Sequence, residues 1–240
     1  MTVGQETEAL SAQLLQAALE YAAMGWRVVP LHWSVSSGVC SCAKGRKCPT
    51  PGKHPYGKDW QKRASFDSER IEQFWKGHPL ANVGIQMGEA SKLIDFETDD
   101  AEQEKILLDL FGENVPVTAT FASHRGKHRL FLWRPDLPGG SIVRVGALVV
   151  RIGNDNLGAM SVFPPSLHPL GSSYRWLVHP ADCPPHAFPD TVMAAMWNLS
   201  GAEQPMLSER RSMEHWEKIL AGVPEGCRDS SMISYIGKLL

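Results

Sequence analysis

The sequence predicts an α+β fold, in which helices flank a mixed or antiparallel central sheet. Segments 6–24, 65–75 and 99–111 place apolar residues at helical spacing. Between and after them lie short runs with the composition and alternation of strands, several of them separated by only a few turn residues. Because strands joined by tight turns pair antiparallel, we expect them to form a sheet with the helices packed behind it.

The chain has 240 residues, enough for one large domain and a small appendage. We assign residues 1–200 to the domain and residues 209–240 to a helical module, which we expect to be truncated. The 24 Lys and Arg residues nearly balance the 26 Asp and Glu residues, which excludes a bulk positive field. The chain shows neither a signal peptide nor a long apolar run, so we expect a cytoplasmic protein without a membrane segment.

The first elements are an amphipathic helix over residues 6–24 and a short strand over residues 26–31. Gly25 ends the helix in the manner of a C-cap. Pro30 has no amide hydrogen to donate, which places the strand at a sheet edge or Pro30 at the strand's end.

A loop over residues 40–55 carries four potential metal ligands, namely Cys40, Cys42, Cys48 and His54. It is rich in Gly, Pro and Lys and cannot bury a core of its own, so a tetrahedral zinc site would supply the missing folding free energy. All four ligands would come from the protein, which makes the zinc structural. The alternative is a loop of free cysteines with an incidental histidine, because the spacing is not the usual paired Cys-x-x-Cys.

Asp95 and Glu97 lie two residues apart in a strand predicted over residues 93–98, so their side chains must share one face. We expect this strand to pair with segment 82–88 as a hairpin. Adjacent carboxylates repel unless they are exposed or a cation lies between them, and a divalent metal ion is the natural candidate. The alternative is an acidic strand end that leads into a solvated helix start, because an N-cap pattern follows at Thr98.

Segments 117–123 and 128–133 have the pattern of two strands joined by a turn. His128 opens the second strand close to three cationic residues, namely Arg125, Lys127 and Arg129. A histidine with cationic neighbours is well placed to bind a phosphate group, although a lone histidine more often has an ordinary structural role.

Two more strands are predicted over residues 147–152 and 160–163, around a turn rich in Gly, Asn and Asp. Arg151 lies in the first of them, where a guanidinium is costly unless it faces a carboxylate or a phosphate. A rigid proline-rich segment follows at residues 164–169, and residues 190–199 form a helix.

Taken in order, six segments resemble the bifunctional primase-polymerase (Prim-Pol) domain of the archaeo-eukaryotic primase superfamily: 22–31, 51–55, 82–85, 94–97, 126–131 and 164–176. Each motif is weak singly, but the ordered set is specific. The resemblance implies a primase-polymerase fold for residues 1–200 and a replication protein of a phage or plasmid, working in the cytoplasm of a bacterial host. Segment 219–240 resembles the helical primase C-terminal module that often precedes a helicase domain, which implies such a domain in the full-length chain.

The resemblance also implies roles for single residues. Asp95 and Glu97 would hold the catalytic Mg²⁺ or Mn²⁺ ions, and His128 would contact the phosphates of the incoming nucleotide. Further nucleotide-binding positions would be Lys127, Arg151, Ser166 and His168.

One position departs from the family pattern. Members usually carry a third metal-binding aspartate two residues before the arginine of the third motif, and here that position is Val149. Valine cannot ligate a cation. Either two carboxylates bind metal more weakly, or another acid such as Asp155 replaces the third, or this copy has lost activity.

The leading hypothesis is therefore template-directed nucleotidyl transfer, in which the chain makes primers and extends DNA on a single-stranded template from nucleoside triphosphates. The second is a catalytically weak or inactive nucleic-acid-binding module, whose zinc loop holds the template through Lys44, Arg46, Lys47 and Lys53. A metal-dependent nuclease ranks third, because paired acids also serve hydrolysis.

Overall fold

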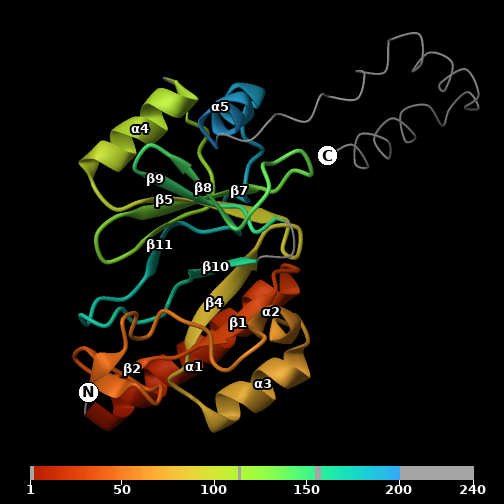
Figure 1. The fold of residues 1–240 in the computed structure, drawn as a ribbon. Helices are drawn as coiled ribbons and strands as arrows, with labels where there is room; N and C mark the ends of the chain where they lie inside the picture. Colours follow the sequence, from red (N-terminus) through yellow and green to blue (C-terminus); the bar gives the residue numbers. More distant parts are fainter. Residues whose placement is uncertain (1–2, 113–114, 155–157, 201–240) are drawn as a thin grey trace, which may run out of the picture.

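The computed structural model describes residues 3–112, 115–154 and 158–200 (Figure 1). It confirms the predicted α+β class, with helices packed on antiparallel sheets. None of the described helices combines the length and hydropathy that a membrane-spanning segment needs. The helical module predicted over residues 209–240 and the side chain of Asp155 both lie outside the described residues.

The smaller sheet belongs mainly to the N-terminal half and has the order β1-β4-β10, with both pairings antiparallel. Its strands are β1 (Val28–Leu31), β4 (Asn82–Met87) and β10 (Ala159–Val162). β1 is an edge strand, as Pro30 predicted. The predicted first helix is confirmed as α1 (Val3–Ala23), which buries Leu14, Ala18 and Tyr21 in the same core as this sheet.

Short elements complete this half of the molecule: β2 (Ser34–Ser36), β3 (Val39–Cys40), the 3-10 turn η1 (Gly45–Lys47), α2 (Trp60–Arg63) and α3 (Ser68–Gly77). The pairing of β2 with β3 was not predicted. α3 begins where the side chain of Asp67 accepts hydrogen bonds from the amides of Glu69 and Arg70, at 3.0 and 3.3 Å.

The larger sheet has six strands in the order β11-β6-β7-β5-β9-β8. They are β5 (Leu93–Thr98), β6 (Thr120–Ala122), β7 (Lys127–Leu132), β8 (Ile142–Val145), β9 (Leu148–Arg151) and β11 (Arg175–Val178). β5 lies near the centre, paired antiparallel with β7 and β9. β8 was not predicted, because half of its residues are exposed and one of them is Arg144.

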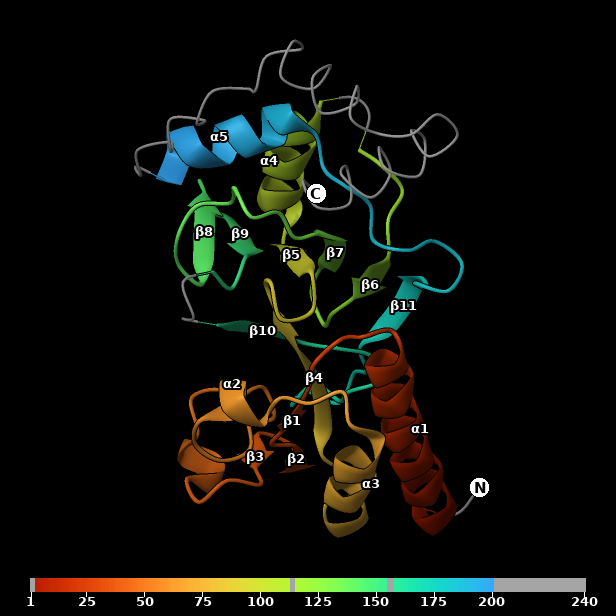
Figure 2. The same ribbon diagram turned by 90° about the vertical axis from the view of Figure 1, so that its right-hand side faces the viewer.

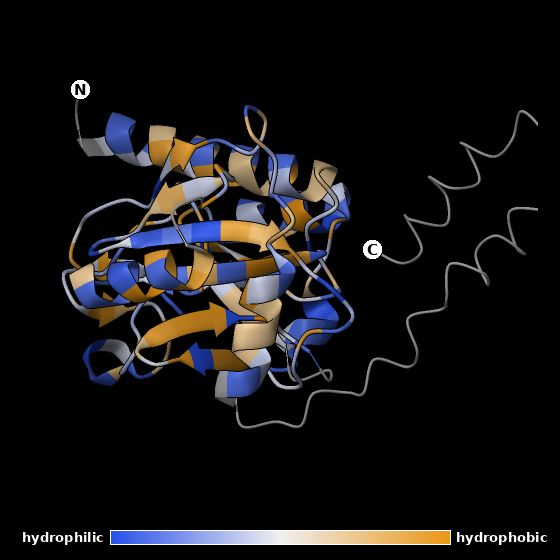
Figure 3. Cartoon of the chain, turned by 90° about the horizontal axis from the view of Figure 1, so that it is seen from above, coloured by the Kyte–Doolittle hydropathy of each residue, from blue (hydrophilic) through white to orange (hydrophobic). Residues whose placement is uncertain are grey.

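Apolar side chains cover both faces of the larger sheet. On one face, Ile94 and Phe96 pack beneath α4 (Ala101–Phe111) and α5 (Asp190–Ser200). On the other face, Leu93, Phe121 and Leu130 join the core shared with α1 and the smaller sheet. Figure 2 shows this layering, with α4 and α5 on the side of the larger sheet that faces away from the smaller one. Figure 3 shows mixed polar and apolar residues along the helices, as expected of helices that cover a core on one side.

The expected hairpin of β4 with β5 is wrong, because the two strands belong to different sheets and share only the bridge between Gly88 and Leu93. At Gly88 (φ +90°) the chain crosses from one sheet to the other, and a Cβ there would lie 2.5 Å from the carbonyl oxygen of Gly153. The chain crosses back between β9, which belongs to the larger sheet, and β10, which belongs to the smaller one. The two crossings bring β10 close to β5, which places polar residues of both sheets in one site.

Candidate active site

The predicted shared face of Asp95 and Glu97 is confirmed by the strand register. Within the larger sheet, Asp95 lies opposite Arg151, and Glu97 lies between His128 and Val149. Because directly paired residues of neighbouring strands point to the same face, all five side chains gather on the side of the sheet that faces β10.

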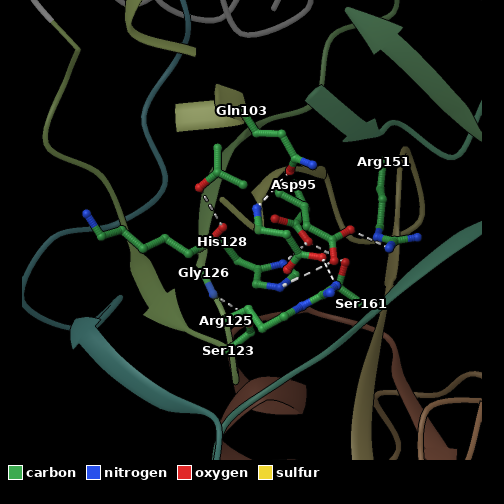
Figure 4. Close-up of polar contacts among 12 residues, drawn as sticks. Asp95, Gln103, Ser123, Arg125, Gly126, His128, Arg151 and Ser161 are labelled. Carbon is green, nitrogen blue, oxygen red and sulfur yellow. Dashed lines mark hydrogen bonds and ion pairs between the residues drawn. The ribbon is translucent and has the colours of Figure 1, made fainter. Parts of the chain in front are cut away.

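Asp95 is fully buried, and its Oδ2 atom accepts two hydrogen bonds. One comes from Nδ1 of His128 at 2.7 Å, and the other from the hydroxyl of Ser161 on β10 at 2.5 Å (Figure 4). Burial alone raises the pKa of Asp95, but the charge of His128 and these two hydrogen bonds outweigh it, so the pKa is lowered. The alternative of a solvated acidic strand end is therefore wrong for Asp95, which is an ionised carboxylate held inside the protein.

His128 is buried against the ring of Phe121, with a centroid separation of 4.5 Å and an interplanar angle of 7°. Burial lowers the pKa of His128, yet the charge of Asp95 and its hydrogen bond, with a further contribution from Glu97, raise it overall. Its second ring nitrogen, Nε2, lies 3.9 Å from Oε1 of Glu97. The raised pKa favours the imidazolium form of the ring, which lies beside two carboxylates.

Arg151 faces a carboxylate, as its place in an apolar strand predicted. Its Nη2 lies 2.5 Å from Oε2 of Glu97, and both side chains are largely buried. Each acid of the pair therefore has one oxygen held by a positive charge.

The remaining oxygens fit a metal ion. Oδ1 of Asp95 is buried without a hydrogen-bond partner, and Oε1 of Glu97 has none among the described residues. An ionised oxygen left unpaired in the interior is costly, and a cation bound there would remove that cost. The donor set is small, because the residue opposite Glu97 is Val149, which cannot ligate a cation.

The turn between β6 and β7 packs directly against the end of β5. A Cβ on Gly126 would lie 1.6 Å from the carbonyl oxygen of Thr98, so only glycine allows this approach. The approach brings Nη2 of Arg125 to 2.5 Å from Oδ2 of Asp99, at the rim of the site. The α4 N-cap predicted after Thr98 is also present, since Asp100 accepts a hydrogen bond from the amide of Gln103.

Lys127 and Arg129 do not join His128. Both pair with Glu104 of α4, at 3.6 and 2.5 Å, on the opposite face of the sheet. The alternation of side chains along β7 explains this placement, because the neighbours of an inward histidine in a strand must point outward. Two of the three cations that the sequence placed near the histidine are thus engaged elsewhere.

The two residues of the proline-rich segment differ in role. The hydroxyl of Ser166 is fully buried and contacts the amide and the carbonyl of Val83, at 2.8 and 3.1 Å, which ties this segment to β4. His168 stacks on His124 with a centroid distance of 4.5 Å. Burial, followed by the charges of Lys53, His124 and Arg125, lowers the pKa of His168 to about 4, so its ring is neutral at pH 7.

The cysteine loop forms a second centre. The ligand atoms of Cys40, Cys42, Cys48 and His54 all lie within 4.8 Å of one another, and no other group of three or more such side chains occurs among the described residues. Desolvation raises the pKa of Cys42, but hydrogen bonds from the Lys44 amide and from the other ligands lower it to about 6, which favours the thiolate. The loop could hold a metal ion such as zinc.

Sequence reasoning missed one contributor to the acidic site. Ser161 donates to Asp95, and its only signal was a polar residue in a short apolar strand, Ala159–Val162.

Comparison with known proteins identifies the family to which the chain belongs. No curated protein matches the chain. The family model described as bifunctional DNA primase/polymerase, N-terminal, matches residues 18–191, which include both carboxylates, His128, Arg151 and the cysteine loop. The match covers well over half of the chain, and activity in this family is nucleotidyl transfer of the primase/polymerase type. The chain therefore belongs to the bifunctional DNA primase/polymerase family and carries its N-terminal domain.

Proposed function

We propose that this chain performs template-directed nucleotidyl transfer, making primers and extending DNA during replication of a phage or plasmid. The observation that carries the proposal is the pair Asp95 and Glu97 on a face that also holds His128 and Arg151. Oδ1 of Asp95 is buried without a hydrogen-bond partner, and Oε1 of Glu97 accepts no hydrogen bond from a described residue. Paired acids next to cations are what metal-assisted transfer of a nucleotide needs.

Asp95 and Glu97 would hold the catalytic ions. Two Mg²⁺ or Mn²⁺ ions bound there would activate the 3′-hydroxyl of the primer and neutralise the departing pyrophosphate. The protein contributes fixed charges around them. His128 is held by Asp95 with its Nε2 side turned toward Glu97, and as an imidazolium it offers an N–H to a phosphate oxygen. Arg151 has a buried Nε without a partner, a second donor for the same purpose.

The template would lie along the cysteine loop. Lys44, Arg46 and Lys47 are exposed, and the ion pairs of the described residues include none of them. Free cations on a rigid loop suit the phosphate backbone of single-stranded DNA. A structural zinc ion bound by Cys40, Cys42, Cys48 and His54 would supply that rigidity.

The direct test is incorporation of deoxynucleotides and ribonucleotides on a primed and on an unprimed single-stranded template, with Mn²⁺ or Mg²⁺. We expect extension by the wild type, loss of at least about a hundredfold in Glu97→Gln, and wild-type rates in Glu89→Gln, which changes an exposed glutamate in a turn. Equal rates in the wild type and in Glu97→Gln would contradict the proposal, and shortening of the DNA would indicate a nuclease instead.

A second candidate is a nucleic-acid-binding module with weak or no catalysis. The presence of Val149 opposite Glu97 favours it, because one expected metal ligand is missing. Strong, salt-dependent binding of single-stranded DNA together with no incorporation at high Mn²⁺ would support this second function over the first.

A further inference from the structure

Lys53 differs from the other cations of the cysteine loop. Lys44, Arg46 and Lys47 are exposed, whereas Lys53 is partly buried. Its ammonium lies within electrostatic range of Glu97, Asp99, Arg125 and Arg151, which are residues of the candidate active site and its rim. The cysteine loop therefore sends one side chain toward the acidic site and leaves the rest on the surface.

The acids near Lys53 are already paired with other cations. Glu97 pairs with Arg151 and Asp99 with Arg125, each at 2.5 Å. Lys53 itself takes part in no ion pair with any described residue, although it lies close to both pairs. The positive charge of Lys53 is therefore not balanced by a carboxylate of its own. Because the side chain is also partly buried, this charge favours binding of an anion.

The surroundings of Lys53 offer further donors for an anion. His168 lies near it and stacks on His124 at the rim of the site. Nδ1 of His168 accepts a hydrogen bond from the amide of Leu170 at 3.2 Å, so the proton of the neutral ring is on Nε2. An imidazole N–H donor on His168 and two cationic side chains, Lys53 and Arg125, thus lie near one another at this rim.

The backbone around Lys53 is held on both sides. The amide of Gly52 points at Sγ of Cys40, 3.5 Å away, and the carbonyl of Gly52 accepts a hydrogen bond of 2.9 Å from the side chain of Asn82. The same buried Asn82 exchanges two hydrogen bonds with the backbone of Leu167, at 2.8 and 2.9 Å. The position of Lys53 is therefore fixed relative to β4 and to the segment that carries His168.

We propose that Lys53 binds the phosphate groups of the incoming nucleoside triphosphate, and so belongs to the nucleotide site and not to the template surface. The proposal rests on the proposed function, because the triphosphate is the substrate of that reaction. It divides the basic residues of the cysteine loop into two groups, with Lys53 facing the nucleotide and Lys44, Arg46 and Lys47 facing the template.

The test measures two affinities on the same variants in the presence of Mn²⁺: that for a non-hydrolysable deoxynucleoside triphosphate, and that for single-stranded DNA. We expect Lys53→Ala to weaken nucleotide binding by about tenfold or more and to leave DNA binding within about twofold of the wild type. Lys53→Arg should retain most of the nucleotide affinity. Lys47→Ala, a matched change at an exposed lysine of the same loop, should show the reverse pattern.

Two results would overturn the role of Lys53: nucleotide affinity of Lys53→Ala equal to that of the wild type, or a loss of DNA affinity without a loss of nucleotide affinity. Each of these leaves the proposed function intact. If the wild type binds no nucleotide with Mn²⁺, both the proposed function and the role of Lys53 are contradicted, so the two failures are distinguishable.

Discussion

Nδ1 of His128 lies 2.7 Å from Oδ2 of Asp95, and both side chains are buried on neighbouring strands of the larger sheet. An unpaired carboxylate or imidazolium would be costly at this depth, so each group makes the other tolerable as a charge. The pair fixes which oxygen of Asp95 is engaged and leaves Oδ1 without a partner. This unpaired oxygen is the one that is free to bind a metal ion.

Val149→Asp should strengthen metal binding. Val149 lies opposite Glu97 on the face of the two acids, so an aspartate there adds a third carboxylate to the donor set. We expect the Mn²⁺ concentration that gives half-maximal nucleotide incorporation to fall by about tenfold. Val149→Asn, which has the same size but no charge, is the control. No change in the Mn²⁺ requirement would mean that two acids suffice or that a different acid already serves.

Ser161→Ala should destabilise the protein through Asp95. The hydroxyl of Ser161 donates to a fully buried carboxylate, and its loss should lower the free energy of unfolding by about 2 kcal/mol in urea titrations at pH 7. The same change in an Asp95→Asn background should cost clearly less, since the acceptor is no longer charged. Equal costs in both backgrounds would show that the contact with Asp95 is not what Ser161 contributes.

Removal of metal from the cysteine loop should lower the melting temperature. We expect purified protein to carry about one zinc ion per chain, and chelation to remove it together with part of the stability. Cys48→Ser should reproduce the effect, whereas Cys183→Ser, which changes a cysteine outside the cluster, should not. Zinc content and melting temperature that are the same in Cys48→Ser and Cys183→Ser would contradict the assignment.

The pair of Glu104 with Arg129 predicts a pH-dependent part of the stability. The hydrogen bond from Arg129 is the largest influence, and the pKa of Glu104 is lowered to about 2. Because the folded-state pKa lies below that of the unfolded chain, the stabilisation is present above about pH 4.3 and is lost as the pH falls toward 2. Glu104→Gln should cost about 1 kcal/mol at pH 7, a value reduced by solvent screening, and almost nothing near pH 2.

The control for Glu104 is Glu102→Gln, which changes an exposed acid in the same helical turn. The free energy of unfolding of both variants and of the wild type is measured by urea titration at several values between about pH 2 and pH 7. A cost for Glu104→Gln that does not change with pH would contradict the ion pair.

Local periodicity was sufficient for the central features of the site. The shared face of Asp95 and Glu97 follows from the alternation of side chains along a strand, and the carboxylate partner of Arg151 follows from the cost of a buried charge. The cysteine cluster follows from four potential ligands in one short loop that cannot bury a core. The same alternation, applied to β7, places Lys127 on the face opposite to His128, where it pairs with Glu104.

Contacts between the two sheets were beyond sequence reasoning. Turn residues predict that the chain reverses, but not whether the next strand returns to the same sheet, which is why the expected pairing of β4 with β5 is wrong. The contact of Ser161 with Asp95 and the placement of Lys53 near Glu97 depend on that crossing and on tertiary packing.

The central claim is that Asp95 and Glu97 hold the catalytic ions, and Mn²⁺ binding tests it most directly. Binding is measured by electron paramagnetic resonance in the presence of a non-hydrolysable nucleoside triphosphate. The two proteins compared are the wild type and the variant that combines Asp95→Asn with Glu97→Gln. Circular dichroism would confirm that both proteins are folded. We predict about two ions bound per wild-type chain with the nucleotide, and a loss of affinity of at least about tenfold in the variant. Equal Mn²⁺ stoichiometry and affinity in the two proteins would contradict the claim that these acids hold the catalytic ions.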